Sequence, residues 1–250
     1  MGFLLRERYD DLHTPMPASA HNGAFTLLID ADDTLWENNI YFERVIARFF
    51  QDFPGHSPRA LRQTLDDVER EIVLSHGYGL SAFEYALVRT CERLAGAAPS
   101  PEREAEVRAL ARSVNQHPME ILPGVPETLA YLASRYSLIL MSKGDPGEQS
   151  AKLERSGLRH HFSAVEIVPE KDPDTYRDTL ARHGLAAFST WMIGNSPKSD
   201  VNPALAAGLN AVFVPHDQTW VLEHEHLSPP EAEPPRLLVL ERFAELQEHF

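Results

Sequence analysis

The segment Phe25-Thr26-Leu27-Leu28-Ile29-Asp30-Ala31-Asp32-Asp33-Thr34-Leu35 joins an unbroken apolar run to three acidic residues within four positions. A short apolar run of this kind is typical of a strand buried on both faces of a parallel sheet. Such a strand brings its carboxylates to the edge of the sheet where open α/β folds bind ligands. Three carboxylates so close repel one another, and a bound cation is the usual means of stabilising them. The segment alone also fits a plain turn, because Asp and Thr are good turn residues.

The composition around this segment is that of an ordinary globular protein with an acidic balance. A chain of 250 residues is long enough for one large domain or for a domain with a smaller insert. The formal net charge of −14 argues against nucleic acid or an anionic membrane as a partner. The single cysteine, Cys91, excludes an internal disulfide framework and fits a reducing compartment. No apolar run matches a membrane span or a signal peptide, so we expect a cytoplasmic protein.

A long helical region follows the acidic segment. Between Asn39 and about His117 the apolar residues repeat at helical spacing in four stretches, and no strand-like alternation occurs. About 80 residues are far too many for a simple crossover between two strands. We therefore expect a helical cap domain at residues 38–117, inserted into a core domain that comprises residues 1–37 and 118–250. Residues 1–23 are expected to form a loose leader with one helical turn.

After Pro118 the pattern changes to alternating strands and helices. Apolar runs predict strands at 137–141, 164–168, 189–193 and 211–214, and the segments between them predict helices at 123–136, 146–156, 175–183 and 204–207. A Pro-rich loop then precedes an edge strand at 237–240 and a closing helix at 241–248. Strands that alternate with helices of this length indicate an α/β fold with a doubly wound parallel sheet and right-handed crossovers.

Four of the predicted strands end in polar clusters. Each cluster alone reads as turn, cap or solvated loop residues. The carboxyl ends of parallel strands share one edge of the sheet, however, so four clusters should converge on one site. The clusters are Asp30 with Asp32, Ser142 with Lys143, Lys171 alone, and Asn195 with Asp200.

This set of side chains suits phosphoryl transfer. A carboxylate can attack phosphorus and form an acyl phosphate, and a second carboxylate can protonate the leaving oxygen and later activate water. Nucleophile and phosphate are both anionic, so Mg²⁺ and a lysine are needed to neutralise them. Mg²⁺ prefers a few oxygen ligands, which matches a sparse acidic site without His or Cys.

The same residues resemble the motifs of the haloacid dehalogenase-like (HAD) hydrolases. Asp30-Ala31-Asp32-Asp33-Thr34-Leu35 resembles the DxDxTL signature, and the strand ending at Ser142 resembles the second motif. Lys171 resembles the third motif, and the segment from Gly194 to Asp200 resembles the fourth. The segment Leu122-Pro123-Gly124-Val125 is similar to the one that precedes the second motif. The fold implied is a HAD-like Rossmannoid core, with a cap like that of phosphoglycolate-phosphatase-like and dehalogenase-like members.

The resemblance implies a role for each residue of the first three motifs. Asp30 would be the nucleophile that forms an aspartyl-phosphate, and Asp32 would be the general acid and base. Ser142, with the N–H groups of Lys143 and Gly144, would bind the transferring phosphate. Lys171 would neutralise the nucleophile and the phosphate.

The resemblance also implies the cofactor. Mg²⁺ would be bound by the Asp30 carboxylate, the Asp32 backbone carbonyl and the fourth motif. Asn195 stands where an aspartate is usual in the family. Its amide oxygen can ligate a metal but brings no charge, so either the metal affinity is lower or Asp200 carries more of the role.

Three reaction classes are compatible with such a fold. Members that act as 2-haloacid dehalogenases lack an acid at the position of Asp32, so this residue favours a phosphatase acting on a small phosphomonoester. A phosphonate hydrolase would use a lysine in the cap, and the stretch 38–117 contains none. A catalytically weak binding or regulatory protein remains open because of Asn195. The expected partner is a small phosphorylated metabolite; the oligomeric state stays undetermined.

Residues near the hinges are the candidates for choosing the substrate. Glu37, Asn38 and Asn39 follow the acidic segment directly, and Tyr78 lies in a Gly-rich turn of the helical region. We expect Trp220 to dock the tail onto the core. The segment from His224 to His226 lacks the helical i, i+4 spacing of zinc enzymes and is expected to be a solvated loop.

Overall fold

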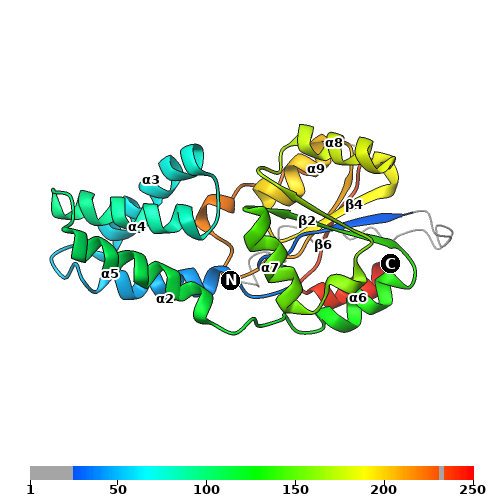
Figure 1. Cartoon of the computed structure of the whole chain (residues 1–250). Helices are drawn as coiled ribbons and strands as arrows, with labels where there is room; N and C mark the ends of the chain where they lie inside the picture. Colours follow the sequence, from blue (N-terminus) through cyan, green and yellow to red (C-terminus); the bar gives the residue numbers. More distant parts are fainter. Residues whose placement is uncertain (1–24, 231–233) are drawn as a thin grey trace.

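The computed structural model describes residues 25–230 and 234–250 and has a six-stranded parallel sheet at its centre (Figure 1). The strand order is β3-β2-β1-β4-β5-β6. The strands are β1 Thr26–Ile29, β2 Ser137–Lys143, β3 Ala164–Val168, β4 Thr190–Gly194, β5 Asn210–Phe213 and β6 Leu237–Val239. The edge strand predicted at 237–240 is thereby confirmed, and the predicted leader at 1–23 lies outside the described residues.

The central strand β1 is buried on both faces. Leu27 and Ile29 pack into one apolar cluster with helices on one side of the sheet, while Leu28 packs into the cluster on the other side. All three side chains are fully buried, and each contributes about 2–3 kcal/mol by leaving water. The continuous apolar run, rather than an alternating one, is therefore the pattern that a doubly covered strand requires.

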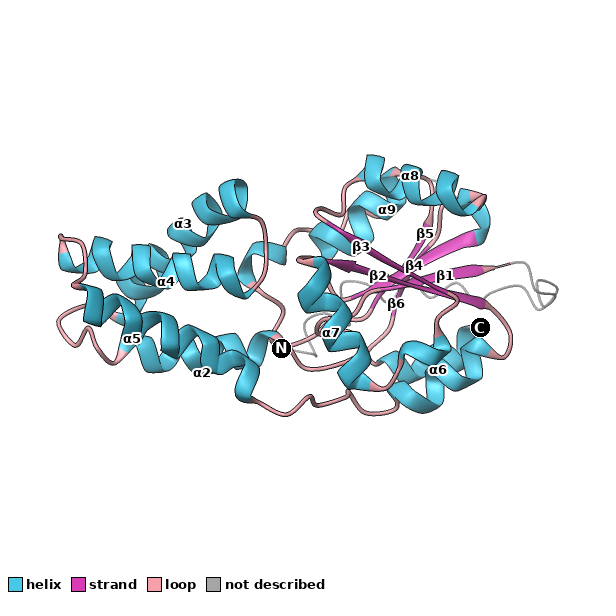
Figure 2. Ribbon diagram, in the orientation of Figure 1, coloured by secondary structure: helices cyan, strands magenta, loops and turns pink. Residues whose placement is uncertain are grey.

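Helices cover both faces of the sheet (Figure 2). The helices α6, α7 and α10 pack against one face, and α8 and α9 pack against the other. Their bounds are α6 Val125–Ala133, α7 Pro146–Ser156, α8 Pro173–His183, α9 Asn202–Ala206 and α10 Leu246–His249. The predicted doubly wound α/β core is confirmed.

Residues 39–112, between β1 and β2, form a separate bundle of helices that stands beside the sheet (Figure 1). The helices are α2 Asn39–Phe50, α3 Pro58–His76, α4 Leu80–Ala95 and α5 Pro101–Arg112. They pack around an apolar cluster of their own, with Phe49, Leu65 and Leu87 fully buried in it. We call these four helices the cap.

Several element ends differ from those predicted. The strand β2 extends to Lys143, because Ser142 and Lys143 still pair with Ile167 and Val168 of β3. The helix α6 ends at Ala133, short of the predicted end at Tyr136.

Two C-terminal helices also differ. A turn of π-helix, Pro197–Val201, precedes α9, which therefore begins earlier than the predicted 204. The predicted closing helix begins only at Leu246, after a 3-10 turn at Phe243–Glu245. In the part of the chain that the structure describes, no helix has both the length and the apolar character needed to cross a membrane.

Candidate active site

Asp30 lies at the carboxyl end of β1 and is buried together with Lys171. The Lys171 Nζ atom lies 2.5 Å from Asp30 Oδ1, and the Thr34 hydroxyl donates to Asp30 Oδ2 at 3.1 Å. Burial raises the pKa of Asp30 above its ordinary value, and the ammonium group of Lys171 opposes that rise. Lys171 therefore supplies a buried positive charge that stabilises the buried carboxylate of Asp30.

Lys171 also binds the last acid of the predicted set. Its Nζ atom lies 2.7 Å from Asp200 Oδ1, while Asp200 Oδ2 accepts the Ser196 N–H at 2.9 Å. Burial alone would lower the pKa of Lys171, but Asp200 and Asp30 outweigh it and raise the pKa. Gly194 makes room for this arrangement, because a Cβ atom there would lie 2.2 Å from Asp200 Oδ2.

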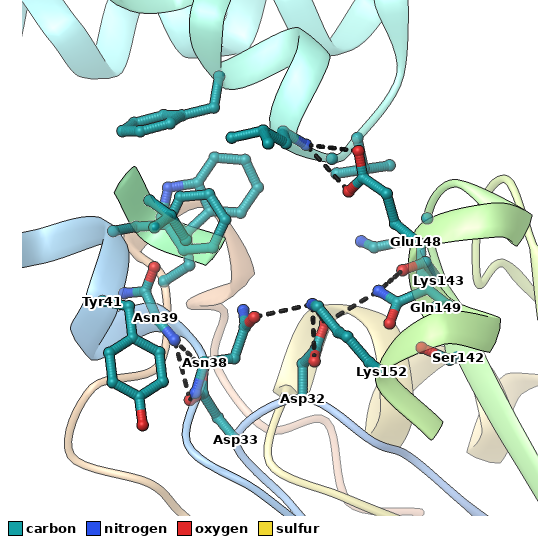
Figure 3. Close-up of a pocket in the computed structure, with 18 of the residues that line it drawn as sticks. Asp32, Asp33, Asn38, Asn39, Tyr41, Ser142, Lys143, Glu148, Gln149 and Lys152 are labelled. Carbon is teal, nitrogen blue, oxygen red and sulfur yellow. Dashed lines mark hydrogen bonds and ion pairs between the residues drawn. The ribbon is translucent and has the colours of Figure 1, made fainter. Parts of the chain in front are cut away.

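Asp32 has a different environment from Asp30 (Figure 3). The Lys152 ammonium lies 2.8 and 3.0 Å from its two oxygens, and Gln149 Nε2 and Trp36 Nε1 donate to it at 2.9 and 2.7 Å. Burial would raise the pKa of Asp32, but Lys152, aided by the other two donors, lowers it. The two carboxylates of the first motif are thus stabilised by two different lysines.

Sequence reasoning missed Lys152 and Gln149. Both lie on α7, three positions apart, so they face the same way toward the end of β1. Asn38 joins them, since its Oδ1 atom accepts from Lys152 Nζ at 2.8 Å. The available signal was a glutamine and a lysine at helical spacing directly after the strand that ends at Ser142.

The second motif shows one difference from its expected role. Ser142 is buried at the end of β2 and lines the same cavity as Asp30. The Gly144 N–H, expected to bind phosphate, instead donates to the Val168 carbonyl at 3.0 Å. This bond continues the β2–β3 ladder by one residue, so the N–H is occupied in the present state.

The side chain of Lys143 turns away from Asp30. Its Nζ atom lies 2.7 Å from Glu223 Oε1 and 2.8 Å from Ser199 Oγ, and 4.2 Å from the centre of the Tyr78 ring. Burial would raise the pKa of Glu223, but Lys143 together with the Ser199 and Ser196 hydroxyls lowers it to about 2.

Asn195 directs its amide oxygen toward the nucleophile loop. Its Oδ1 atom accepts from the Thr34 hydroxyl at 3.3 Å, and its Nδ2 atom donates to Thr219 at 2.9 Å. The Thr34 hydroxyl thus contacts both Asn195 Oδ1 and Asp30 Oδ2, so these two oxygens face the same hydroxyl. A hard cation such as Mg²⁺ prefers an oxygen-only donor set of this kind, and the residues fit it.

The described residues hold one group of acidic and histidine side chains that could bind a metal ion. Atoms of Asp33, Glu37 and His216 lie within 4.8 Å of one another. Asp33 accepts the N–H groups of Asn38 and Asn39 at the start of α2, and burial raises its pKa to about 7. The residues predicted for the metal, Asp30, Asp32, Asn195 and Asp200, do not belong to this group.

A cavity of about 220 Å³ separates the sheet edge from the cap. It is lined by the predicted residues of all four motifs and by side chains of α2, α3 and α4. Tyr78 reaches across it and donates to Glu170 at 2.6 Å, whereas His76 packs its ring against Tyr85. The Trp220 indole donates to Glu69 of α3 at 3.0 Å, so Trp220 contacts the cap, and the expectation that it docks on the core was wrong in this respect.

The segment from His224 to His226 is an exposed loop, as the sequence predicts. The His224 Nε2 atom contacts the Thr219 carbonyl at 3.0 Å, and both histidines are exposed. Neither histidine belongs to a group of possible metal ligands among residues 25–230 and 234–250.

Fold, motif order and converging side chains define a hydrolase of the HAD type, and comparison with known proteins agrees. The chain belongs to the haloacid dehalogenase-like hydrolase family, whose model matches residues 26–208. The crystal structure of a haloacid dehalogenase-like family hydrolase from Xanthomonas campestris superposes with a TM-score of 0.78 at 31% identity, covering 94% of each chain. The family resemblance found in the sequence is confirmed.

The chain is also similar to one curated protein and shares its fold with a further solved structure. A phosphoserine phosphatase from Thermus thermophilus is 35% identical over 133 residues, which are 49% of this chain and 51% of that protein. The chain thus spans about half the length of the curated relative it matches. The fold is shared with a predicted phosphoglycolate phosphatase from Haemophilus somnus, with a TM-score of 0.60 and 17% identity over 90% of this chain and 97% of that one.

Proposed function

We propose that the protein is a Mg²⁺-dependent phosphoric monoester hydrolase that acts on a small phosphomonoester through an aspartyl-phosphate. One observation carries the proposal: two carboxylates, Asp30 and Asp32, line one cavity and have separate lysine partners. Two carboxylates held in different environments can divide the roles of nucleophile and proton carrier. The phosphatase from Thermus thermophilus supports the same reaction class.

In the first step, an Asp30 oxygen attacks phosphorus, and the bond to the ester oxygen breaks. Asp32 gives its proton to that oxygen, so the substrate leaves as an alcohol. In the free protein Lys152 favours the ionised form of Asp32. A dianionic phosphate placed beside Asp32 raises its pKa again, because like charges disfavour ionisation. Proton transfer is thereby coupled to substrate binding.

In the second step, Asp32 accepts a proton from water, and the resulting hydroxide attacks the phosphorus of the aspartyl-phosphate. The bond between phosphorus and the Asp30 oxygen breaks, so inorganic phosphate leaves and the Asp30 carboxylate is regenerated. Ser142 would donate to a phosphate oxygen, and Lys171 would balance the charge of Asp30 in both steps. Asp30, the Asp32 carbonyl and Asn195 would hold Mg²⁺, which supplies additional charge neutralisation for phosphate when bound. Asp200, whose oxygens bind Lys171 and the Ser196 N–H, would orient the lysine rather than contact the metal directly.

The proposal extends to the organisation of the chain. Residues 38–117 would act as a cap over a core made of residues 1–37 and 118–250, with closure excluding bulky substrates. The partner would be a small phosphorylated metabolite, rather than nucleic acid or membrane, and the enzyme would be cytoplasmic.

Hydrolysis of p-nitrophenyl phosphate in Mg²⁺ tests the proposal. Asp30→Asn should lower the turnover by more than about a thousandfold, because the nucleophile is lost. Asp67→Asn, on the exposed face of α3, is the matched control and should retain the wild-type rate. EDTA should abolish turnover, and added Mg²⁺ should restore it.

Two outcomes would favour the other candidates. Release of chloride from 2-chloropropionate without any phosphatase activity would indicate a dehalogenase. Binding of phosphate esters without turnover of any ester in a panel would indicate a binding or regulatory protein. The observation that favours this candidate is the neutral side chain of Asn195.

A further inference from the structure

Glu69 is a buried acid in the cap wall of the cavity. It lies on α3, is only 6% exposed, and lines the cavity together with Ile72 and Val73 of the same helix. Its Oε2 atom accepts one hydrogen bond, from Trp220 Nε1 at 3.0 Å. In residues 25–230 and 234–250 no ion pair joins its carboxylate to a basic side chain, and Oε1 accepts no hydrogen bond.

Three other acids that line the cavity are each paired with a lysine. Asp30 pairs with Lys171, and Asp32 pairs with Lys152. Glu223 is likewise paired with a lysine, Lys143. Glu69 is different because it forms no ion pair in the described part of the chain: its one hydrogen-bond donor is neutral, and Arg62, whose charge also acts on it, is itself paired with Glu43 and Asp66. A buried carboxylate without a paired cation is costly. Burial accordingly raises the pKa of Glu69 to about 7, even though Trp220 opposes the rise.

We propose that Glu69 binds a primary ammonium group at the end of the substrate remote from the phosphate. It would thereby make the enzyme selective for amine-bearing phosphomonoesters. This inference rests on the proposed phosphatase function. A compact ammonium supplies the missing positive charge and three donors, whereas a neutral hydroxyl would leave the charge of the carboxylate unbalanced.

The neighbours of Glu69 support a small organic cation. Trp220 holds Oε2 in place, so Oε1 is free to accept from a ligand. The Trp220 ring lines the cavity as well, and an indole attracts cations to its face. Ile72 and Val73 offer apolar contacts to the methylene groups that would join the phosphate to the amine.

Matched pairs of substrates test the inference. The probes are ω-aminoalkyl phosphates with two to five carbons, each compared with the n-alkyl phosphate in which a methyl group replaces the ammonium. Wild-type protein should prefer the amine by about tenfold in kcat/KM at one chain length, a factor that equals about 1.4 kcal/mol. In Glu69→Gln this preference should fall to about one, while kcat/KM for the alkyl phosphates changes by less than about threefold.

Two further variants test whether the position of the Glu69 carboxylate matters, as opposed to the charge of the helix or the folding of the protein. Glu71→Gln removes the same charge from the same helix, but Glu71 is exposed and pairs with Arg93 at the surface, so the amine preference should remain. Glu69→Asp retracts the carboxylate by one methylene and should move the preferred amine to a chain one carbon longer.

The failures can be told apart. If wild-type protein hydrolyses no phosphate ester, including p-nitrophenyl phosphate, the proposed function fails. If it hydrolyses esters but prefers the amine at no chain length, only the role of Glu69 fails. Equal losses for amine and alkyl substrates in Glu69→Gln would mean that Glu69 merely holds Trp220, and would also overturn the inference.

Discussion

Lys171 is the residue on which the two buried acids of the site depend. Its ammonium lies between Asp30 and Asp200, and all three side chains are at least nine-tenths buried. Removing the lysine leaves two carboxylates near each other in a site of low dielectric constant. Breaking a buried ion pair from one side is far more costly than losing an exposed one.

We therefore predict that Lys171→Met destabilises the protein by about 3–5 kcal/mol as well as abolishing phosphatase activity. Urea unfolding measured at pH 7.5 would test this. Lys198→Met is the control, because Lys198 is exposed and its ammonium hydrogen-bonds to a backbone carbonyl, so its loss should cost less than about 0.5 kcal/mol. Equal losses for the two variants would contradict the prediction.

Residues within the motifs could be predicted because strand ends and acidic residues are adjacent in the sequence. Lys152 and Gln149 could not, because a polar pair on an amphipathic helix looks the same whether it faces solvent or a carboxylate. Trp220 was misplaced for a related reason: the sequence does not say which side of a cleft a loop side chain will reach. The bond from the Gly144 N–H to β3 likewise depends on strand register.

At the scale of elements, the turn between α3 and α4 makes polar contacts between cap and core. Gly77 and Gly79 both have positive φ values, 72° and 108°, which lets the turn direct Tyr78 toward the sheet edge. The Glu148 carboxylate of α7 accepts the Leu80 N–H at 3.0 and 3.1 Å (Figure 3). An anion at the amino end of α4 is favoured by the helix dipole, so this contact holds the cap against the core.

The two glycines provide a matched comparison. A Cβ atom at Gly79 would lie 2.8 Å from Glu148 Oε2, whereas one at Gly77 would meet nothing within 4 Å. We predict that Gly79→Ala raises KM for small phosphomonoesters about threefold to tenfold by opening the cleft, while Gly77→Ala leaves KM near wild type. Both variants should lose about 1 kcal/mol of stability through backbone strain. Equal KM values would show that the Glu148 contact does not control closure.

At the scale of the whole molecule, the strand order explains why four distant motifs meet. The strand β1 pairs with β2 on one side and β4 on the other, so Ser142 and Asn195 flank Asp30. Lys171 follows β3, one strand further out, and its long side chain spans the gap. The sequence predicted that these ends share one edge, but alternating strands and helices do not specify the order of strands along it.

Buried acids also couple the stability of the whole molecule to pH. Burial raises the pKa of Glu69 to about 7; Arg62 opposes the rise, and Asp66 and Glu43 reinforce it. In the unfolded chain a glutamate titrates near 4.3. A group whose pKa is raised by folding favours the folded state below its unfolded pKa, and this contribution is lost as the pH rises through the folded value.

We predict that the unfolding free energy of wild-type protein falls between pH 4.5 and pH 7.5 by about 3 kcal/mol more than that of Glu69→Gln, which cannot titrate at this position. Urea unfolding of both proteins across this range gives the difference directly, because the titrations of Asp30 and Asp33 are common to both. Glu71→Gln should follow the wild-type curve, since Glu71 is exposed. Parallel curves for wild type and Glu69→Gln would mean that the Glu69 carboxylate is as well stabilised in the cap wall as in water. An amine would then have no missing charge to supply there.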